Sequence, residues 1–423
     1  MKRIPKILIL IVLLCSCHKT EQEKQQIKIF NTVWETVNTK YFDATFNGVD
    51  WGSEYDYYKP IIANCTSTDS LYYYLNQMLF KLNVSHIGAV PSNEPESIGS
   101  PQLFLDAYVG IDLRIINNEA IITKVDKNST AFKAGIRPGF RILKVNGKLI
   151  ESFIKEKIDN PLPPFNDINM RLLVTENIIR EFYGEIGDTV VITYLDAHKS
   201  GYQKSLKLAD RSLTKHTSVP WLPPMYAKFN KRVLNKETAY IHFDVFLPVI
   251  LDSVIQGIQD YKRFSNLIID LRGNPGGDFN TRRLIASQFV NKQTLFWKYQ
   301  SRTSVNNVYL DPPKSPYKGR LFILIDELSS SSSEEFSGAM KAIGRATIIG
   351  QKTAGKVLTM EVVPLADGGF FIYPNQQTKT SKNEVLEAVG VTPDIEVSLD
   401  KNDLLKGIDT QLKRVLKLID DKY

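Results

Sequence analysis

The chain has 423 residues, of which 43% are hydrophobic and 23% are charged. This composition is typical of a globular protein of two or three domains and excludes a disordered or fibrous chain. The formal charge of +7 comes without a dense basic cluster, which argues against nucleic acid as a partner. Because the only cysteines are Cys15, Cys17 and Cys65, the sequence offers neither a disulfide framework nor a cysteine-based metal site.

The N-terminal residues have the pattern of a targeting segment. A basic start precedes the apolar run 7–14, which is too short to span a bilayer. Cys17 follows at a position that resembles a bacterial lipobox, in which the cysteine is lipidated. We therefore expect a signal peptide over residues 1–16, lipidation of Cys17, and a polar tether over 17–27 that holds the protein outside the cytoplasm at the cell envelope. An ordinary secretory signal cleaved nearby is the alternative.

Residues 28–100 predict a small helical domain. Apolar side chains recur at helical spacing from Ile29 to Val37 and again from Leu71 to Leu82. This part ends near Ser85 and His86. A single histidine in such a place is ordinarily a packed or loop residue, and only its wider context can suggest chemistry.

Residues 104–208 change to short strands separated by glycine turns. The run from Ala134 to Gly147, AGIRPGFRILKVNG, resembles a PDZ domain; an unrelated small β domain is the alternative. The resemblance implies a peptide-binding domain that adds an extended C-terminal tail to a sheet edge. It also implies a loop whose backbone binds the terminal carboxylate, here Tyr108, Val109, Gly110 and Ile111.

Residues 212–400 alternate strands and helices, which predicts a mixed α/β sheet flanked by helices. The apolar strand 266–271 runs into the glycine-rich turn 272–277. The apolar strand 321–325 runs into five serines, residues 329–333. Because sites form where the carboxyl ends of parallel strands gather, we expect these two turns to meet. One terminal helix is predicted from 404 to 418, within the last segment, 401–423.

A glycine turn beside a serine turn has the minimum equipment for acyl transfer. The glycines offer backbone N–H groups for an oxyanion, and a serine offers a nucleophile. The plainer interpretation is that the serines cap the helix that follows, since serine is a favoured N-cap. A serine hydroxyl also needs a general base. Lys356 comes after the next helix and strand, where the chain can return it to the same edge.

The ordered motifs resemble the S41 serine peptidases, the carboxy-terminal processing and tricorn-like group. The resemblance covers nearly the whole mature chain and includes the PDZ-like part that precedes the core. It implies a multidomain α/β (mixed α+β) protein with a ClpP/crotonase-like catalytic core. The other histidines show no ligand spacing, so we expect no metal, and we expect no cofactor. The motifs are the runs 270–277, 329–334, 350–356 and 390–394.

The same resemblance implies the roles of individual residues. Ser331 corresponds to the family's nucleophile, and Lys356 to the general base of the processing branch. The N–H of Ser332, with one from Gly276 or Gly277, corresponds to the oxyanion hole. Lysine can accept a proton only if burial or a neighbouring cation disfavours its ammonium form.

The chain departs from the processing branch at one position and approaches the tricorn-like branch at another. Met360 stands where that first branch has a glutamine that orients the lysine. The pair Ser85 and His86 resembles the Ser-His pair of the second branch, in which the histidine is the base. The sequence therefore leaves two candidate bases, with Lys356 preferred and His86 as a possible partner.

The predicted function is that of a serine endopeptidase that cleaves extracytoplasmic proteins or peptides through an acyl-enzyme on Ser331. The PDZ-like domain would hold the C-terminal tail of the substrate. The alternative is a catalytically weakened lipoprotein that only binds peptides or ligands, which Met360 and the unusual serine run favour.

Overall fold

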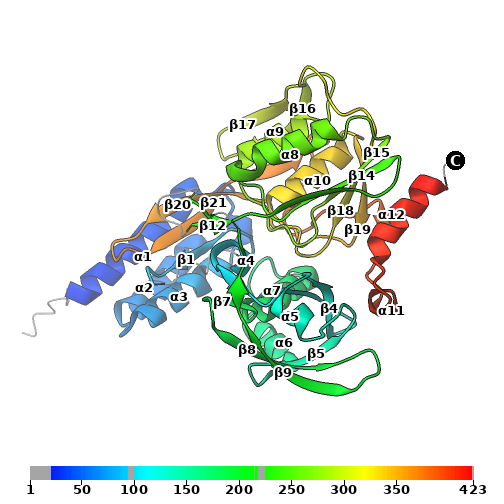
Figure 1. Cartoon of the computed structure of the whole chain (residues 1–423). Coiled ribbons are helices and arrows are strands. Elements are labelled where there is room, and N and C mark those ends of the chain that lie inside the picture. Colours follow the sequence, from blue (N-terminus) through cyan, green and yellow to red (C-terminus); the bar gives the residue numbers. More distant parts are fainter. Residues whose placement is uncertain (1–20, 94–99, 214, 218–223, 422–423) are drawn as a thin grey trace, which may run out of the picture.

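Figure 1 shows the computed structural model of the chain, in which residues 21–93, 100–213, 215–217 and 224–421 are described. Three parts follow one another: a helical unit, a small β-sheet unit, and a larger α/β core. The predicted lipidation site, Cys17, lies outside the described residues. Within the described part of the chain, no helix is long and apolar enough to cross a membrane.

The helical unit packs three helices around an aromatic core. Phe371 and Tyr373 of a hairpin from the far end of the chain complete this core, and Figure 1 shows that hairpin beside the helices. Strand β1 pairs antiparallel with β21 and joins the two segments. The elements are α1 (Glu21–Lys40), η1 (Phe46–Gly48), α2 (Trp51–Ala63), α3 (Thr68–Phe80), β1 (Gly88–Val90), β20 (Thr359–Pro364) and β21 (Phe370–Thr380).

Two features of this unit differ from the predictions. Helix α1 begins at Glu21, so the stretch predicted as a tether is helical from that residue, and Gln26 is buried. Helix α2 was not predicted, because Gly52 and Pro60 interrupt its pattern. Asp50 nevertheless caps it by accepting a hydrogen bond from the N–H of Ser53, which satisfies a free donor of the first turn.

The second part contains a five-strand antiparallel path, β3-β4-β5-β8-β9, in which β3 is an edge strand. Helix α7 packs beside that edge. Its elements are β3 (Ile111–Ile116), β4 (Glu119–Val125), α5 (Thr130–Lys133), β5 (Arg141–Val145), β6 (Lys148–Leu149), α6 (Ile150–Asp159), α7 (Asp167–Arg180), β8 (Thr189–Leu195) and β9 (Gly201–Lys207). Short elements beside it are α4 (Pro101–Phe104), β2 (Ala107–Tyr108), β7 (Tyr183–Gly184), β10 (Ala209–Asp210), β11 (Lys215–His216) and β12 (Met225–Tyr226).

The core is built on a six-stranded sheet in the order β13-β14-β15-β18-β19-β22, and all neighbours except β13 and β14 are parallel. Its strands are β13 (Phe229–Val233), β14 (Thr238–Phe243), β15 (Asn266–Asp270), β18 (Arg320–Ile325), β19 (Ala346–Gly350) and β22 (Ile395–Glu396). The remaining elements are α8 (Pro248–Asp260), α9 (Phe279–Ser287), β16 (Thr294–Gln300), β17 (Val305–Leu310), α10 (Ser332–Ala342), α11 (Lys401–Leu405) and α12 (Thr410–Asp420). The mixed helix and sheet class is confirmed.

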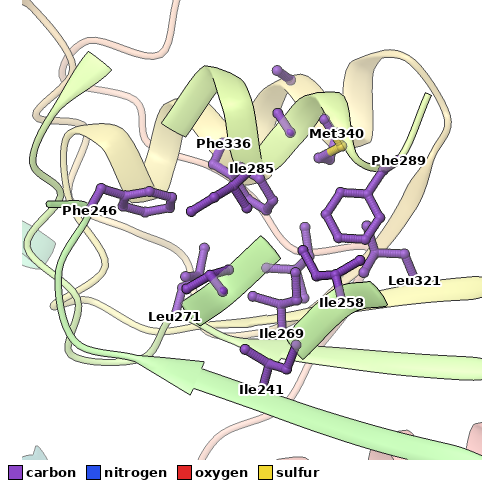
Figure 2. Close-up of a cluster of buried hydrophobic side chains, with 14 of the residues drawn as sticks. Ile241, Phe246, Ile258, Ile269, Leu271, Ile285, Phe289, Leu321, Phe336 and Met340 are labelled. Atoms are coloured by element: carbon purple, nitrogen blue, oxygen red, sulfur yellow. The ribbon is translucent and has the colours of Figure 1, made fainter. Parts of the chain in front are cut away.

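Alternate residues of the buried strands serve opposite faces of this sheet. Ile269 packs under helices α8, α9 and α10, as Figure 2 shows, whereas Ile268 packs against Val415 of α12. This period of two explains why the strands are apolar throughout: both faces are covered. The serine run follows β18 and leads into α10, and its hydrogen bonds to residues 271–277 place it at the carboxyl ends of β15 and β18.

The single terminal helix predicted for residues 404–418 is wrong. Helix α11 ends at Leu405, and α12 begins at Thr410. Gly407 has a φ of +73°, and Asp409 then caps α12 by accepting a hydrogen bond from the N–H of Leu412. The apolar spacing runs across both segments, so periodicity alone could not locate the break.

Candidate active site

The side chains of the serine run, residues 329–333, form hydrogen bonds with the glycine turn. Four of its five hydroxyls donate to backbone carbonyls of residues 271–277, while the hydroxyl of Ser331 donates to none of them. The bonds are Ser329 Oγ to Leu271 O (2.8 Å), Ser330 Oγ to Pro275 O (3.1 Å), Ser332 Oγ to Gly277 O (2.7 Å) and Ser333 Oγ to Asn274 O (2.8 Å). The two turns meet as predicted, and the repetition of serine has a structural cause.

Ser331 stands at the N-cap of α10 in a strained conformation, with φ +52° and ψ −118°. A positive φ is uncommon for a residue other than glycine, and such strain gathers at functional sites. The N–H of Ser331 donates to the carbonyl of Lys356 at 3.0 Å and to the Glu334 carboxylate at 3.1 Å. These bonds hold the residue that the sequence selects as the nucleophile.

The carboxylate of Glu334 organises the surroundings of Ser331. It is fully buried and accepts hydrogen bonds from the hydroxyl of Thr353 and from the N–H groups of Gly355 and Lys356. Burial raises its pKa, and the hydrogen bonds oppose that shift. The sequence indicated only an acid in the first turn of a helix. In the structure, this acid ties the 353–356 segment to the serine turn.

Within the described residues, the glycine turn has one backbone N–H group without a hydrogen-bond partner, that of Gly277. The N–H of Gly276 already donates to the side chain of Asn274, and its carbonyl accepts from the N–H of Phe246 at 2.7 Å. Because a peptide unit is planar and trans, the N–H of Gly277 points away from Phe246. No hydrogen bond from the described residues occupies the N–H of Gly277 or of Ser332.

His86 is oriented by a chain of hydrogen bonds. Its Nδ1 lies 2.7 Å from the hydroxyl of Ser85, which lies 3.0 Å from the carboxylate of Glu387. With Glu387 ionised, the single proton of the Ser85 hydroxyl goes to the carboxylate. Nδ1 must then carry the proton of the neutral imidazole, and Nε2 keeps its lone pair. This is the tautomer that a general base requires.

Glu387 is held by backbone groups from both sides of the site. Its carboxylate accepts from the N–H of Ser85 at 2.6 Å and from the N–H of Val357 at 3.1 Å. Burial raises its pKa to about 7, against the effect of these hydrogen bonds. Ser85, which the sequence paired with His86 without giving it a role, and Glu387, which it did not single out, are the functional candidates that it missed. No local spacing in the sequence indicates them, because the hydrogen bond between Ser85 and Glu387 joins residues 302 positions apart.

Lys356 lies close to both Ser331 and His86. Its backbone carbonyl binds Ser331, and its positive charge helps burial to lower the pKa of His86 to about 3. Within the described residues, no hydrogen bond or ion pair reaches its ammonium group. Met360, in place of the orienting glutamine, lies on β20 with its side chain 40% exposed. The structure therefore brings the two candidate bases together and orients His86 more fully.

The predicted peptide-binding loop lies apart from these residues. Gly110 has a φ of +87°, and its Cα approaches the side chain of Ser129 so closely that a Cβ would lie 2.2 Å from it. The loop leads into edge strand β3, whose outer side can accept another strand. Tyr108, Gly110 and Ile111 line a cavity of about 700 Å³ between the β-sheet unit and the core, whereas Val109 is fully buried.

Three family models match the chain in the order of its three parts. Residues 20–80 match the tricorn protease C1 domain, residues 102–174 the PDZ domain, and residues 237–397 peptidase family S41. The chain therefore carries a peptidase S41 domain, the domain of a class of serine-type peptidases, with a PDZ domain before it. The predicted resemblance is thereby confirmed.

Individual relatives agree with this class. The carboxy-terminal processing protease CtpB of Bacillus subtilis is 23% identical over 73% of this chain and 58% of its own length. A carboxyl-terminal-processing protease of Picosynechococcus is 23% identical over 85% of this chain and 80% of its own length. A solved photosystem II D1 C-terminal processing protease has the same fold, with a TM-score of 0.58 at 18% identity over 90% of this chain and 96% of that chain. The match thus spans less than two thirds of the Bacillus relative.

Proposed function

We propose that the protein is a serine peptidase that cleaves proteins or peptides through an acyl-enzyme on Ser331. The observation that carries the proposal is the position of Ser331: a strained N-cap whose neighbours leave two N–H groups unoccupied. The attacking hydroxyl, the N–H groups of Ser332 and Gly277, and a base cluster at His86 and Lys356 supply the parts of acyl transfer.

The chemistry follows from these groups. The base takes the proton of the Ser331 hydroxyl as its oxygen attacks the carbonyl carbon of the substrate. The N–H groups of Ser332 and Gly277 stabilise the oxyanion that forms, and the positive end of α10 adds to this stabilisation. The protonated base then gives its proton to the amine as the C–N bond breaks, which leaves the acyl-enzyme. The base next takes a proton from water, whose oxygen attacks the acyl carbon, and returns that proton to the Ser331 oxygen as the ester bond breaks.

The test of the activity is a comparison of Ser331→Ala with the wild-type protein on an unfolded protein substrate. We expect cleavage by the wild type and a loss of at least about 10³-fold in the variant. Equal cleavage by both would overturn the assignment. If the wild type bound peptide tails at residues 108–111 but neither cleaved them nor reacted with a serine-directed acylating reagent, the binding-protein alternative would be correct.

We further propose His86 as the general base, in place of the preference for Lys356 that the sequence suggested. The support is the chain from Glu387 through Ser85, which leaves Nε2 with its lone pair. The positive charge of Lys356 keeps the resting imidazole unprotonated, and the same repulsion makes the imidazole a weaker base. Lys356 stays the second candidate because its backbone contacts Ser331 and no acid within the described residues neutralises its ammonium.

Two variants separate the candidate bases. If His86 is the base, Lys356→Met removes a repulsive charge, raises the pKa of His86 and retains activity, while His86→Asn loses about 10²–10⁴-fold in kcat. If Lys356 is the base, the order of the two losses is reversed. The measurement is kcat on one peptide substrate, with folding of both variants checked by circular dichroism.

We propose that the substrate is the C-terminal tail of an extracytoplasmic protein, and that the enzyme is anchored by a lipid on Cys17. The support is the PDZ domain with its edge strand β3, and the lipobox-like sequence before Cys17. Cells that express the wild type should incorporate a labelled fatty acid into the protein and retain it in the membrane fraction. Cys17→Ser should remove both, and retention of the label would contradict the anchor.

A further inference from the structure

A buried arginine lies directly behind the serine and glycine turns. Arg282 of α9 is 3% exposed, and it forms an ion pair with the buried carboxylate of Glu335 on α10. Its Nη1 donates to the hydroxyl of Ser332 at 3.0 Å, and its Nη2 donates to the hydroxyl of Tyr299 at 2.7 Å. Its Nε has no hydrogen-bond partner within the described residues. None of these groups takes part in the acyl-transfer steps proposed above.

The hydrogen bonds around Ser332 have a fixed direction. A hydroxyl has one proton, and that of Ser332 goes to the carbonyl of Gly277 at 2.7 Å, so the same oxygen accepts from Arg282. The guanidinium charge polarises the hydroxyl and strengthens its bond to Gly277. A directed chain therefore runs from Arg282 through Ser332 to Gly277.

This series of hydrogen bonds joins Ser332 and Gly277, the two residues whose N–H groups are proposed to bind the oxyanion. The turns approach so closely that a Cβ on Gly276 would lie 2.8 Å from the nitrogen of Ser332. Gly276 and Gly277 both have positive φ values, +106° and +130°, and glycine has the greatest freedom to change them. An oxyanion hole works only when both donors stand about 2.7–3.1 Å from one oxygen.

We propose that Arg282 is a positioning residue of the active site: through the side chain of Ser332 it clamps the serine turn to the glycine turn and fixes the spacing of the two oxyanion donors. The inference rests on the proposed function. Stability alone does not account for Arg282, because a buried ion pair generally stabilises a core no better than apolar side chains of the same size. Positioning of Ser332 gives the ion pair of Arg282 and Glu335 a functional role.

The proposal is tested first with Ser332→Ala, which removes the hydroxyl and keeps the N–H. We expect kcat to fall about 10- to 100-fold, short of the loss of a whole donor, with KM changed less than twofold. The Ki of a peptide aldehyde, whose adduct with Ser331 places an oxyanion in the hole, should rise by the same factor. Ser332→Thr, which restores a hydroxyl, should recover most of the loss.

Arg282→Met tests the arginine itself. As in Ser332→Ala, we expect kcat to fall while KM changes less than twofold. Its matched control is Arg345→Met: Arg345 is a partly buried arginine of the same core that donates to carbonyls of Phe289, Tyr317 and Gly319. The control should lower stability without changing the ratio of kcat to KM. If Arg282→Met does not fold, Ser332→Ala still tests the clamp.

The outcomes separate this inference from the proposed function. If Ser331→Ala is as active as the wild type, the peptidase assignment itself fails. If Ser331→Ala is inactive while Ser332→Ala keeps its kcat and its Ki for the aldehyde within twofold, the clamp is wrong and the peptidase assignment stands.

Discussion

At the scale of single residues, the site depends on strained backbones next to buried carboxylates. Ser331, His86 and Ala388 all have φ values between +50° and +60°, although none is glycine. Each adjoins a carboxylate: Ser331 binds Glu334, Ser85 beside His86 binds Glu387, and Ala388 directly follows Glu387. The local cost of such conformations is of the order of 1–3 kcal/mol each, so the surroundings must impose them.

The ionisation of Glu387 should control the activity. When Glu387 takes up a proton, it donates to Ser85, and Ser85 then donates to Nδ1 of His86. This moves the imidazole proton to Nε2 and removes the lone pair that a base needs. Since burial raises the pKa of Glu387 to about 7 and that of His86 lies at about 3, Glu387 is the group that titrates near neutrality.

We therefore predict that kcat/KM rises with pH through a midpoint near 7. Glu387→Gln should remove this midpoint and leave a lower activity that is flat from pH 5.5 to 8. The free energy of unfolding is a poorer readout than activity, because the pKa shifts of Glu387 and His86 have opposite effects on it as pH changes. The raised pKa of Glu387 stabilises the folded state at low pH and is lost as pH rises from about 4.5 to 7, whereas the lowered pKa of His86 costs stability as pH falls below about 6.5. A midpoint unchanged in Glu387→Gln would contradict the prediction.

At the scale of elements, two turns at the carboxyl ends of β15 and β18 make one unit. The serine run supplies hydroxyl donors, and the glycine turn supplies carbonyl acceptors along the same stretch. The parallel pairing of the two strands sets these turns side by side. Four of the serines thus have a structural role, although their hydroxyls bind the glycine turn instead of capping α10 as the plainer interpretation held. This role is compatible with the catalytic interpretation of Ser331.

Gly276→Ala should destroy this contact. A Cβ would stand 2.7 Å from Cβ of Ser331, and the φ of +106° disfavours any side chain. We expect kcat to fall by at least about 10²-fold because the turns must move apart. Gly344→Ala is the matched control: its φ is +70°, but no atom lies within 4 Å of the new Cβ. It should cost only about 1–2 kcal/mol of stability and leave kcat unchanged. Similar kcat values for the two variants would contradict the close contact of the turns.

At the scale of the whole molecule, the β-sheet unit is tied to the core beside the site. Arg114 of β3 forms a buried ion pair with Asp326, at 2.7 Å, directly after β18. The N–H of Phe165 donates to the side chain of Asn83, close to His86 in the chain, and Asn166 donates to the carbonyl of Ala354. The segment that precedes α7 therefore touches both segments that bear the candidate bases.

Arg114→Met should destabilise the protein by about 3–5 kcal/mol, because it leaves Asp326 buried without its cation. Lys155→Met is the control, since Lys155 pairs with Asp159 on the surface at 76% and 52% exposure, and should cost less than about 1 kcal/mol. Urea unfolding followed by tryptophan fluorescence measures both. A loss in Arg114→Met as small as in the control would show that the ion pair does not hold the two units together.

The sequence by itself determined the class of fold and the serine and glycine turns, because these depend on local periodicity and on motifs of adjacent residues. The choice of Ser331 followed from the resemblance to the S41 peptidases and stays a prediction. It missed α2 and the break before α12, where glycine and proline or an uninterrupted apolar spacing conceal the boundary. Only the tertiary structure assembled Glu387, Ser85 and His86, since their hydrogen bonds join residues some 302 positions apart. It also showed why five serines stand in a row. Hydrogen bonds between distant turns are set by how the strands pair, and no spacing along the chain encodes them.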